Sequence, residues 1–175
     1  MPEPRTRDLP ENELAPLHVF RFHVSFTRAN LPGAHAEIKT VPLCSGAFAE
    51  CTGLDVEMDV GEYVEGGRNN GVLQRPGRAK VSRITLKRGM FYPASGTVDN
   101  QLWRWFQDIV DGVLPVRRYD GTINVLDENQ QPVAVWRFTR GLPAKLVGPQ
   151  LNAATGAVAV EEIQIAHEGL RMEVS

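Results

Sequence analysis

A forty-residue stretch over 50–89 constrains the fold more than any other part of this sequence. Residues 55–60 alternate acidic and apolar side chains, which predicts a strand with one acidic and one apolar face. A polar, glycine-rich run follows over 61–71, the dipeptide Pro76-Gly77 predicts a turn, and a strand-like pattern resumes over 81–86. An extended hairpin arm of this kind cannot bury much of itself against its own domain. We therefore expect it to fold over a site or to reach a neighbouring molecule.

The length and composition favour one globular domain. The chain has 175 residues, of which 42% are hydrophobic, and we expect a flexible N-terminal arm over 1–16 followed by a single domain over 17–175. The formal net charge of −2 gives no electrostatic argument for binding nucleic acid or a membrane surface. We interpret the short basic pairs Lys87-Arg88 and Arg117-Arg118 as solvated or ion-paired surface.

The sequence indicates a chain made in a reducing cytoplasm. No apolar run approaches the roughly 18 residues that cross a bilayer, and the N-terminus lacks an apolar signal region. We therefore expect synthesis and assembly in the cytoplasm, without membrane insertion by this chain. Cys44 and Cys51 are too few for a disulfide framework or a metal site, and we expect buried or half-buried thiols.

Most of the remaining chain has the pattern of β-strands. Residues 18–26 carry an apolar face that predicts a buried strand, and this face comprises Phe20, Phe22, Val24 and Phe26. In the last expected strand, the apolar alternation shifts phase across Glu161-Glu162, which predicts a β-bulge or burial on both faces. The other expected strands cover 47–51, 118–126, 133–138 and 158–167, with a hairpin turn at 127–132 and long loops at 27–46 and 141–157.

One segment, about 100–111, has the pattern of an α-helix. Asp99 or Asn100 is the expected N-cap, and Gly112 stands where a C-terminal glycine belongs. The expected apolar stripe of this helix comprises Leu102, Phe106, Ile109 and Val110.

Two tryptophans, Trp103 and Trp105, flank the apolar stripe of the expected helix. We expect them to pack onto a sheet, and a binding platform is the alternative. Taken together, the elements predict a mainly β, antiparallel protein with one α-helix and a long extended hairpin arm. A sandwich or a distorted barrel satisfies this pattern.

The sequence contains no recognisable catalytic, cofactor or metal motif. The four histidines lack metal-ligand spacing: His18, His23, His35 and His167. His167-Glu168 is a candidate acid–base pair, but a hydrogen-bonded histidine at a strand end is the favoured interpretation. Glu161 and Glu162 are adjacent on a strand and therefore point to opposite faces. We expect a protein that is not an enzyme and that uses no cofactor.

The order of several short motifs resembles the tail tube proteins of contractile phages, and more closely the tube proteins of phage-tail-like contractile injection systems. The resemblance covers about residues 18–172. Its motifs are Phe48–Leu54, Glu62–Gly67, Pro76-Gly77, Ile84–Gly89, Leu102-Trp103-Trp105, Leu126–Glu128, Pro132-Val133 and His167–Leu170.

This resemblance implies a structural subunit of a hexameric ring. Rings of this family stack into a rigid hollow tube inside a contractile sheath, and contraction drives the tube into a target. The implied fold is two antiparallel sheets with one helix, shared with the ring protein of type VI secretion. The implied partners are further copies of the chain, sheath, baseplate, spike and terminal cap proteins, and a luminal protein cargo.

The resemblance also implies a role for the hairpin arm in contacts between subunits and in ring stacking. The residues that carry this implied role are Glu62, Tyr63, Glu65, Gly66, Gly67, Asn69, Pro76 and Gly77. Three alternatives stay open. The first is a tail tube protein of a contractile phage that passes DNA. The second, from a different class, is a ligand-binding β-barrel in which the arm acts as a lid, and the third is a hydrolase whose site is dispersed through the fold.

Overall fold

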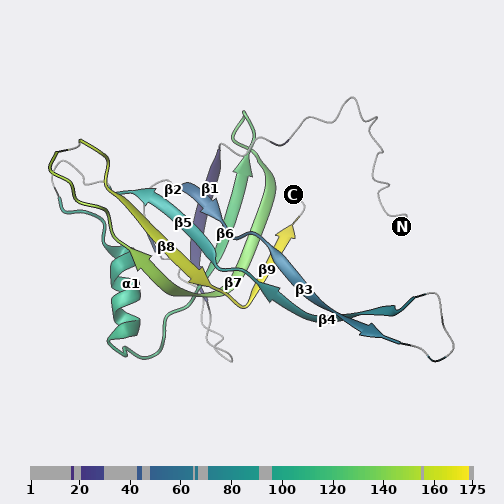
Figure 1. Cartoon of the computed structure of the whole chain (residues 1–175). Helices are drawn as coiled ribbons and strands as arrows, with labels where there is room; N and C mark the ends of the chain where they lie inside the picture. Colours follow the sequence, from purple (N-terminus) through teal and green to yellow (C-terminus); the bar gives the residue numbers. More distant parts are fainter. Residues whose placement is uncertain are drawn as a thin grey trace, which may run out of the picture.

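The computed structural model describes residues 17, 21–29, 43–44, 48–64, 66, 71–90, 96–154 and 156–173. Within these ranges the chain forms antiparallel strands and one α-helix (Figure 1). The elements are β1 (Phe22–Arg28), β2 (Phe48–Thr52), β3 (Val56–Tyr63), β4 (Leu73–Val81), β5 (Ile84–Gly89), α1 (Gln101–Val110), β6 (Tyr119–Leu126), β7 (Pro132–Val147), β8 (Val160–Ala166) and β9 (Gly169–Glu173).

Strand β7 links two layers of sheet. The strand order is β1-β6-β7-β8-β5-β2, and β9 also pairs with β7. The first part of β7 pairs with β6 and β9, whereas its last residues, from Leu142 on, pair with β8. At the change of partner, Arg140 has a φ of 53°, and the ladder with β8 is irregular between Pro143 and Lys145. One layer is therefore β1-β6-β7-β9 and the other is β7-β8-β5-β2.

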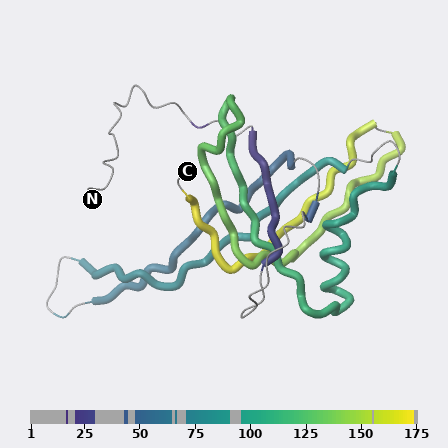
Figure 2. The backbone as a smooth tube through the Cα atoms, turned by 180° about the vertical axis from the view of Figure 1, so that it is seen from behind, coloured from purple at the N-terminus to yellow at the C-terminus, as the bar shows by residue number. Residues whose placement is uncertain are grey.

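The two ends of this strand path, β1 and β2, do not hydrogen-bond to each other, so the structure stays an open sandwich. Their core-facing aromatic rings nevertheless meet, because the centroids of Phe26 and Phe48 lie 6.2 Å apart. The predicted fold class, two antiparallel sheets with one helix, is confirmed. Figure 2 shows the β3–β4 ribbon leaving the layers on one side and α1 lying on the other.

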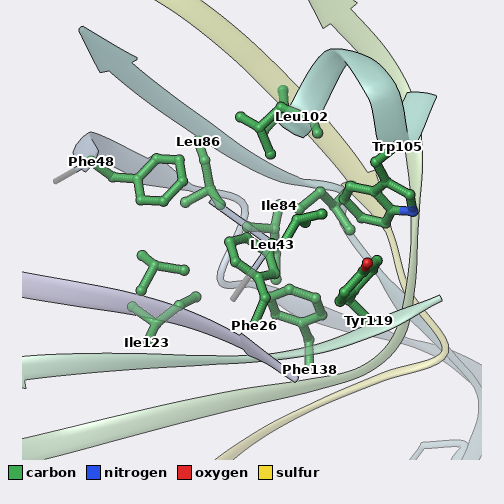
Figure 3. Close-up of a cluster of buried hydrophobic side chains, with 13 residues drawn as sticks. Phe26, Leu43, Phe48, Ile84, Leu86, Leu102, Trp105, Tyr119, Ile123 and Phe138 are labelled. Atoms are coloured by element: carbon green, nitrogen blue, oxygen red, sulfur yellow. The ribbon is translucent and has the colours of Figure 1, made fainter. Parts of the chain in front are cut away.

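Phe26 is central to the core between the layers (Figure 3). Its ring also meets Trp105 and Phe138 edge-on, at centroid distances of 6.5 and 6.2 Å. Such pairs add about 0.5–1.5 kcal/mol each beyond the burial of their area. The predicted core face of the first strand is confirmed at Val24 and Phe26, which are buried. Phe22 is half-buried against the core, and Phe20 lies outside the described residues.

Helix α1 packs onto the core through Leu102 and Trp105. The Trp105 ring meets Phe26 of β1 and Tyr119 of β6 at centroid distances of 6.5 and 5.0 Å, and Trp103 Nε1 donates to Glu161 of β8, so the sheet-packing prediction is confirmed. At the N-terminus, the Asp99 carboxylate accepts from the backbone N–H of Gln101 at 3.0 Å, and Asn100 makes no capping bond with its side chain. The expected stripe is wrong at its end, because Val110 is exposed.

Three expectations about the strands are wrong, each because long-range pairing overrode a local signal. Pro76-Gly77 lies within β4 and not in a turn. The expected loop 141–157 begins only after Val147, because Gly141 and Pro143 lie within strand β7. The C-terminal residues 169–173 form an unexpected strand, β9, against β7. Most of the expected loop 27–46 lies outside the described residues.

The expected irregularity in the last strand is also wrong. Strand β8 pairs with β5 in unbroken register, and Glu161, Ile163 and Ile165 are all buried on one face. A carboxylate occupies a core-facing position, while Val160 is exposed at the strand end. The alternation therefore keeps its phase, and only the chemistry of one core position departs from an apolar pattern. The opposite orientations expected for Glu161 and Glu162 agree with their burial.

Candidate assembly surfaces

The hairpin arm, defined here as residues 56–81, is a two-stranded ribbon separate from the main sheet. Strands β3 and β4 pair with each other along their whole length. Val56, Met58 and Val60 stand opposite the apolar residues Val81, Ala79 and Pro76 in that register. Residues directly opposite each other share a face of the ribbon. One face of the hairpin arm is therefore apolar near its root.

This apolar face is not covered by the described part of the chain. The side chains of Val56, Met58 and Val60 are 55%, 50% and 56% exposed. The opposite face carries charge: Lys80 forms an ion pair with Asp59 at 2.8 Å. An isolated two-stranded ribbon is at best marginally stable in water. The arm is therefore a candidate contact surface for another molecule.

A β-bulge bends the arm at the dipeptide that the sequence suggested as a turn. Met58 pairs with Ala79 but Val60 pairs with Pro76, so β4 has one extra residue opposite Asp59. At Gly77 an added Cβ would come 2.6 Å from the Asp59 carbonyl oxygen. Only glycine lets the two strands approach this closely, so the sequence signal was real but marked a bulge.

A compact set of contacts joins the root of the arm to the main sheet. Gly53 has a φ of 85°, and a Cβ there would lie 2.0 Å from the Arg83 carbonyl oxygen. The Ser82 hydroxyl donates to the Asp55 carboxylate. The ring nitrogens of His167 lie 2.9 Å from the Ser82 carbonyl oxygen and 3.0 Å from that of Gly169. These contacts tie the arm to the turn between β8 and β9.

The predicted assembly residues are distributed over both faces and the tip of the arm. Glu62 accepts from the Gln74 amide at 3.3 Å, on the same face as Val60. Tyr63 is on the other face, with the Arg75 guanidinium 4.3 Å from its ring centroid. Gly66 is exposed at the turn. Glu65, Gly67 and Asn69 lie outside the described residues, whereas Pro76 and Gly77 form the bulge described above.

Three strand edges form a second kind of candidate assembly surface. Strands β1, β2 and β9 each pair with only one neighbour in the described part of the chain. Such an edge carries backbone N–H and C=O groups that can pair with a strand of another molecule. The sheet can therefore be extended at both ends of its strand path.

A buried charged network stabilises the end of the sandwich beside α1. Arg88 Nε donates to Glu161 Oε1 at 2.5 Å, and the two side chains are only 3% and 1% exposed. Trp103 Nε1 donates to the other carboxylate oxygen at 3.0 Å, and Asp99 accepts from Arg88 at 3.3 Å. Burial by itself lowers the pKa of Arg88, but the hydrogen bond and charge of Glu161 outweigh it and raise that pKa.

This network corrects the interpretation of Lys87-Arg88 as surface. Lys87 does pair at the surface, 3.0 Å from Glu50, but Arg88 is a core residue. The sequence offered one signal for the network: Glu161 interrupts an otherwise apolar face of a strand. The sequence analysis interpreted that signal as a bulge or as burial on both faces, and a buried carboxylate is uncommon unless it is paired.

The remaining polar residues that the structure describes lie in an open groove and in surface ion pairs. An open groove of about 590 Å³ crosses the outer face of β1, β6, β7 and β9, with mixed charges that include Asp120, Arg137 and Arg171. Glu168 pairs with Arg118 and Arg140 at 3.3 and 2.9 Å. His167 is a hydrogen-bonded histidine at a strand end, as expected. Across the described ranges, no three His, Cys, Asp or Glu residues are grouped to hold a metal ion.

The two cysteines are free, half-buried thiols. Burial raises the pKa of Cys44 from 9.0 to about 11 and that of Cys51 by the same amount. A high thiol pKa keeps the unreactive protonated form dominant at neutral pH. In the part of the chain that the structure describes, no helix has the length and apolarity needed to traverse a bilayer.

Comparisons with solved structures show the same fold in chains of phage-tail-like particles. A chain of the anti-feeding prophage baseplate, solved with six-fold symmetry, matches with a TM-score of 0.71 and 22% identity over 92% of this chain and 97% of that one. A chain of the sheath–tube complex of the extracellular contractile injection system PVC matches with a TM-score of 0.68 and 24% identity, over 91% and 93%.

A third match is a chain of the anti-feeding prophage cap, with a TM-score of 0.65 and 19% identity over 93% of both chains. No curated protein sequence matches this chain. The family model described as "T4-like virus tail tube protein gp19" matches residues 18–171, which is most of the chain. The chain therefore belongs to the tail tube protein family and is a structural tube subunit.

Proposed function

We propose that this chain is the inner tube subunit of a contractile injection system, in which six copies form a ring and rings stack into a hollow conduit. Membership of the tail tube family supports the tube, and the six-fold symmetry of a similar baseplate supports the number of copies. In such a particle the partners of this chain are sheath, baseplate, spike and terminal cap proteins. A protein cargo occupies the lumen.

The observation that carries this proposal is the uncovered apolar face of the hairpin arm. Val56, Met58 and Val60 lie on a ribbon that makes no pairing with the main sheet. A contiguous apolar face on an otherwise polar ribbon is stabilised when a second molecule covers it. The arm is therefore proposed as the element that joins one copy to the next, with Glu62 and Tyr63 at its outer part.

The open edges of the sheet supply a route to ring closure. When the edge at β1 of one copy lies beside a free edge of the next, the sheet continues from copy to copy. A head-to-tail contact whose rotation closes produces a ring, whereas one that does not close produces a filament. Edge pairing within a ring and arm contacts between copies are thus two separable interactions.

Two other functions lead to different observations. A tail tube of a contractile phage passes DNA, and its gene would lie beside capsid and terminase genes. A ligand-binding β-barrel would remain a monomer and would close around its ligand. The similarity to chains from the anti-feeding prophage and PVC particles favours the injection system over the phage tail. Membership of a structural family counts against the ligand-binding barrel and against an enzyme.

The first experiment measures assembly of the purified chain. Native mass spectrometry is expected to give multiples of six copies of the 19.4 kDa chain, and electron microscopy is expected to show rings or hollow filaments. A protein that stays monomeric at high concentration would overturn the tube proposal.

Replacing residues 59–78 by Asn-Gly leaves the Met58–Ala79 pair beside a two-residue turn. This shortened arm should abolish stacking of the rings without unfolding the layers.

A matched pair of variants isolates the apolar face. The double variant Met58→Thr, Val60→Thr keeps β-forming side chains but removes the apolar contact, so filament yield should fall at least tenfold. The control Glu57→Thr, Asp59→Thr changes the opposite face and should retain most filaments. Equal yields from both variants would show that the apolar face has no role in assembly.

A further inference from the structure

We propose that the hairpin arm of one copy docks on the connection between α1 and β6 of a second copy, with Glu62 entering an arginine-lined cavity there. This inference rests on the proposed function, because it names the surface that the arm contacts. The receiving surface, defined as residues 110–118 together with Arg28 and Arg140, combines exposed apolar side chains with guanidinium groups.

The apolar part of the receiving surface follows α1. Leu114 is 79% exposed, and Val110, Val113 and Val116 are also exposed. Four large apolar side chains within seven residues are unusual for a surface connection of a soluble subunit. They match the chemistry of the arm, whose Val56, Met58 and Val60 are likewise uncovered.

The charged part of the receiving surface is a small cavity of about 170 Å³. Its lining includes four arginines, with Pro115 and Val116 at the apolar side; the arginines are Arg28, Arg117, Arg118 and Arg140. Arg118 and Arg140 share Glu168, and Arg117 pairs with Asp108. Arg28 makes no ion pair within the described ranges. The four arginines thus have two carboxylate partners in these ion pairs, Asp108 and Glu168, so the lining is net positive and suited to a further carboxylate.

The arm presents a carboxylate in the required place. Glu62 is two residues closer to the tip of the arm than Val60. Because side chains two residues apart in a strand share a face, Glu62 and Val60 lie on the same face. Its described contact is with the uncharged Gln74 amide and not with a cation. Laying the apolar face on Val113 and Leu114 would thus carry Glu62 toward an arginine beside them.

One chain cannot make this contact with itself. Figures 1 and 2 show the arm projecting from one side of the molecule and α1, with the connection that follows it, on the other. Two different surfaces on opposite sides make a head-to-tail contact, which either closes into a ring or continues as an open filament. This is the geometry that a ring or a tube requires, and it identifies the occupant as a second copy of this chain.

Cross-linking between singly substituted chains tests the contact directly. One preparation carries Val60→Cys and the other carries Leu114→Cys; both positions are exposed, so folding should be retained. A short bismaleimide is expected to produce a covalent dimer in the mixture and not in either preparation alone. A chain with both substitutions should produce a ladder of oligomers. The native chain, whose thiols are half-buried, reports the background.

The control pairs Val60→Cys with Leu151→Cys, which is an exposed apolar position in the connection between β7 and β8. Cross-linking with Leu114→Cys and not with Leu151→Cys supports the proposal. Tubes in the microscope without a Val60–Leu114 product would overturn it, while leaving the tube function intact. Native chains that never assemble would instead overturn the proposed function. A Leu151 product alone would show that the arm docks on the other connection.

A charge swap tests the role of Glu62 separately from the apolar contact. Glu62→Arg and Arg28→Glu are each expected to lower filament yield at least tenfold, because each places like charges together. Combining both substitutions in one chain should restore most of the yield. No restoration, with the single variants folded by circular dichroism, would show that Glu62 and Arg28 do not meet.

Discussion

The two packed layers and the hairpin arm treat their apolar residues in opposite ways. Ile84, Phe138 and Ile165 have no exposed surface, whereas Val56, Met58 and Val60 on the arm leave half of theirs in solvent. The layers are complete within one chain, because their residues from distant strands cover one another. In the proposed assembly, the apolar face of the arm is buried only against a second copy of the chain, so part of the arm's stability would come from the assembly.

Charged residues show the same contrast. Arg88 and Glu161 are buried together in the layers and hydrogen-bond to further partners, whereas Asp59 and Lys80 pair on the arm with about half of each side chain exposed to water. Removing one partner of a buried pair leaves an uncompensated charge, but an exposed pair contributes little. The difference predicts where substitutions affect folding and where they affect only assembly.

The largest effect is expected for Glu161→Ala. This change leaves the Arg88 guanidinium buried without its main carboxylate, and should lower the free energy of unfolding by about 3–5 kcal/mol. Urea denaturation of the unassembled subunit measures it. Replacing both Arg88 and Glu161 by Leu should recover much of the loss, because no charge then remains buried. A loss below about 1 kcal/mol for Glu161→Ala would mean that the pair is not buried in solution.

The second largest effect is expected in the reactivity of thiols in the layers and on the arm. Because burial raises the pKa of Cys44 and Cys51 from 9.0 to about 11, their thiolate fraction near pH 8 is about 100-fold below that of an ordinary thiol. A cysteine introduced at Val60 on the arm should react with iodoacetamide about 100-fold faster than either. The folded state favours the protonated thiols, so their contribution to stability persists below pH 9 and is lost as the pH rises toward 11.

In urea, all three thiols should react at similar rates. Equal rates in the folded protein would indicate that the layers open around Cys44 and Cys51 as readily as the arm.

Gly53→Ala tests the junction between the two regions. The added Cβ would meet the Arg83 carbonyl oxygen at 2.0 Å, and the φ of 85° disfavours any other side chain. We expect the free energy of unfolding, measured by thermal denaturation, to fall by about 1–3 kcal/mol. The arm should also point in a different direction, and the filaments should be shorter. At Gly66, by contrast, an added Cβ meets no atom within 4 Å, so Gly66→Ala should change stability by less than about 0.5 kcal/mol.

The smallest effect is expected for Lys80→Ala. Its ion pair with Asp59 is solvent-exposed on both sides, so the free energy of unfolding should change by less than about 1 kcal/mol. Chemical denaturation of the monomer is the measurement. A change as large as that of Glu161→Ala would show that the exposed pair matters as much as the buried pair, and that the arm belongs to the cooperative folding unit.

Much of the layered fold was predictable because its signals are local. The alternation in β1, the hairpin of β6 and β7, the helix near 100–111 and the exposed character of the hairpin arm all follow from periods of two or 3.6 residues and from turn residues. The family resemblance added the assembly, and the role of Glu62 to Gly77 stays a prediction for experiment.

The features that the sequence did not predict depend on contacts between residues that are distant in the sequence. Strand β4 was hidden because Pro76-Gly77 has the composition of a turn, and only its pairing with β3 shows that the dipeptide is a bulge. The burial of Glu161 was not predicted, because no sequence rule locates Arg88 opposite it, 73 residues away.

The sequence by itself determined most of the strands, the position of the helix and the presence of an exposed hairpin arm that begins with one apolar strand face. The tertiary structure decided which strands meet, which carboxylate is buried and which surface lies opposite the hairpin arm. The physical reason is range. Side-chain alternation acts between near neighbours along the chain, whereas burial and pairing depend on residues that only folding brings together.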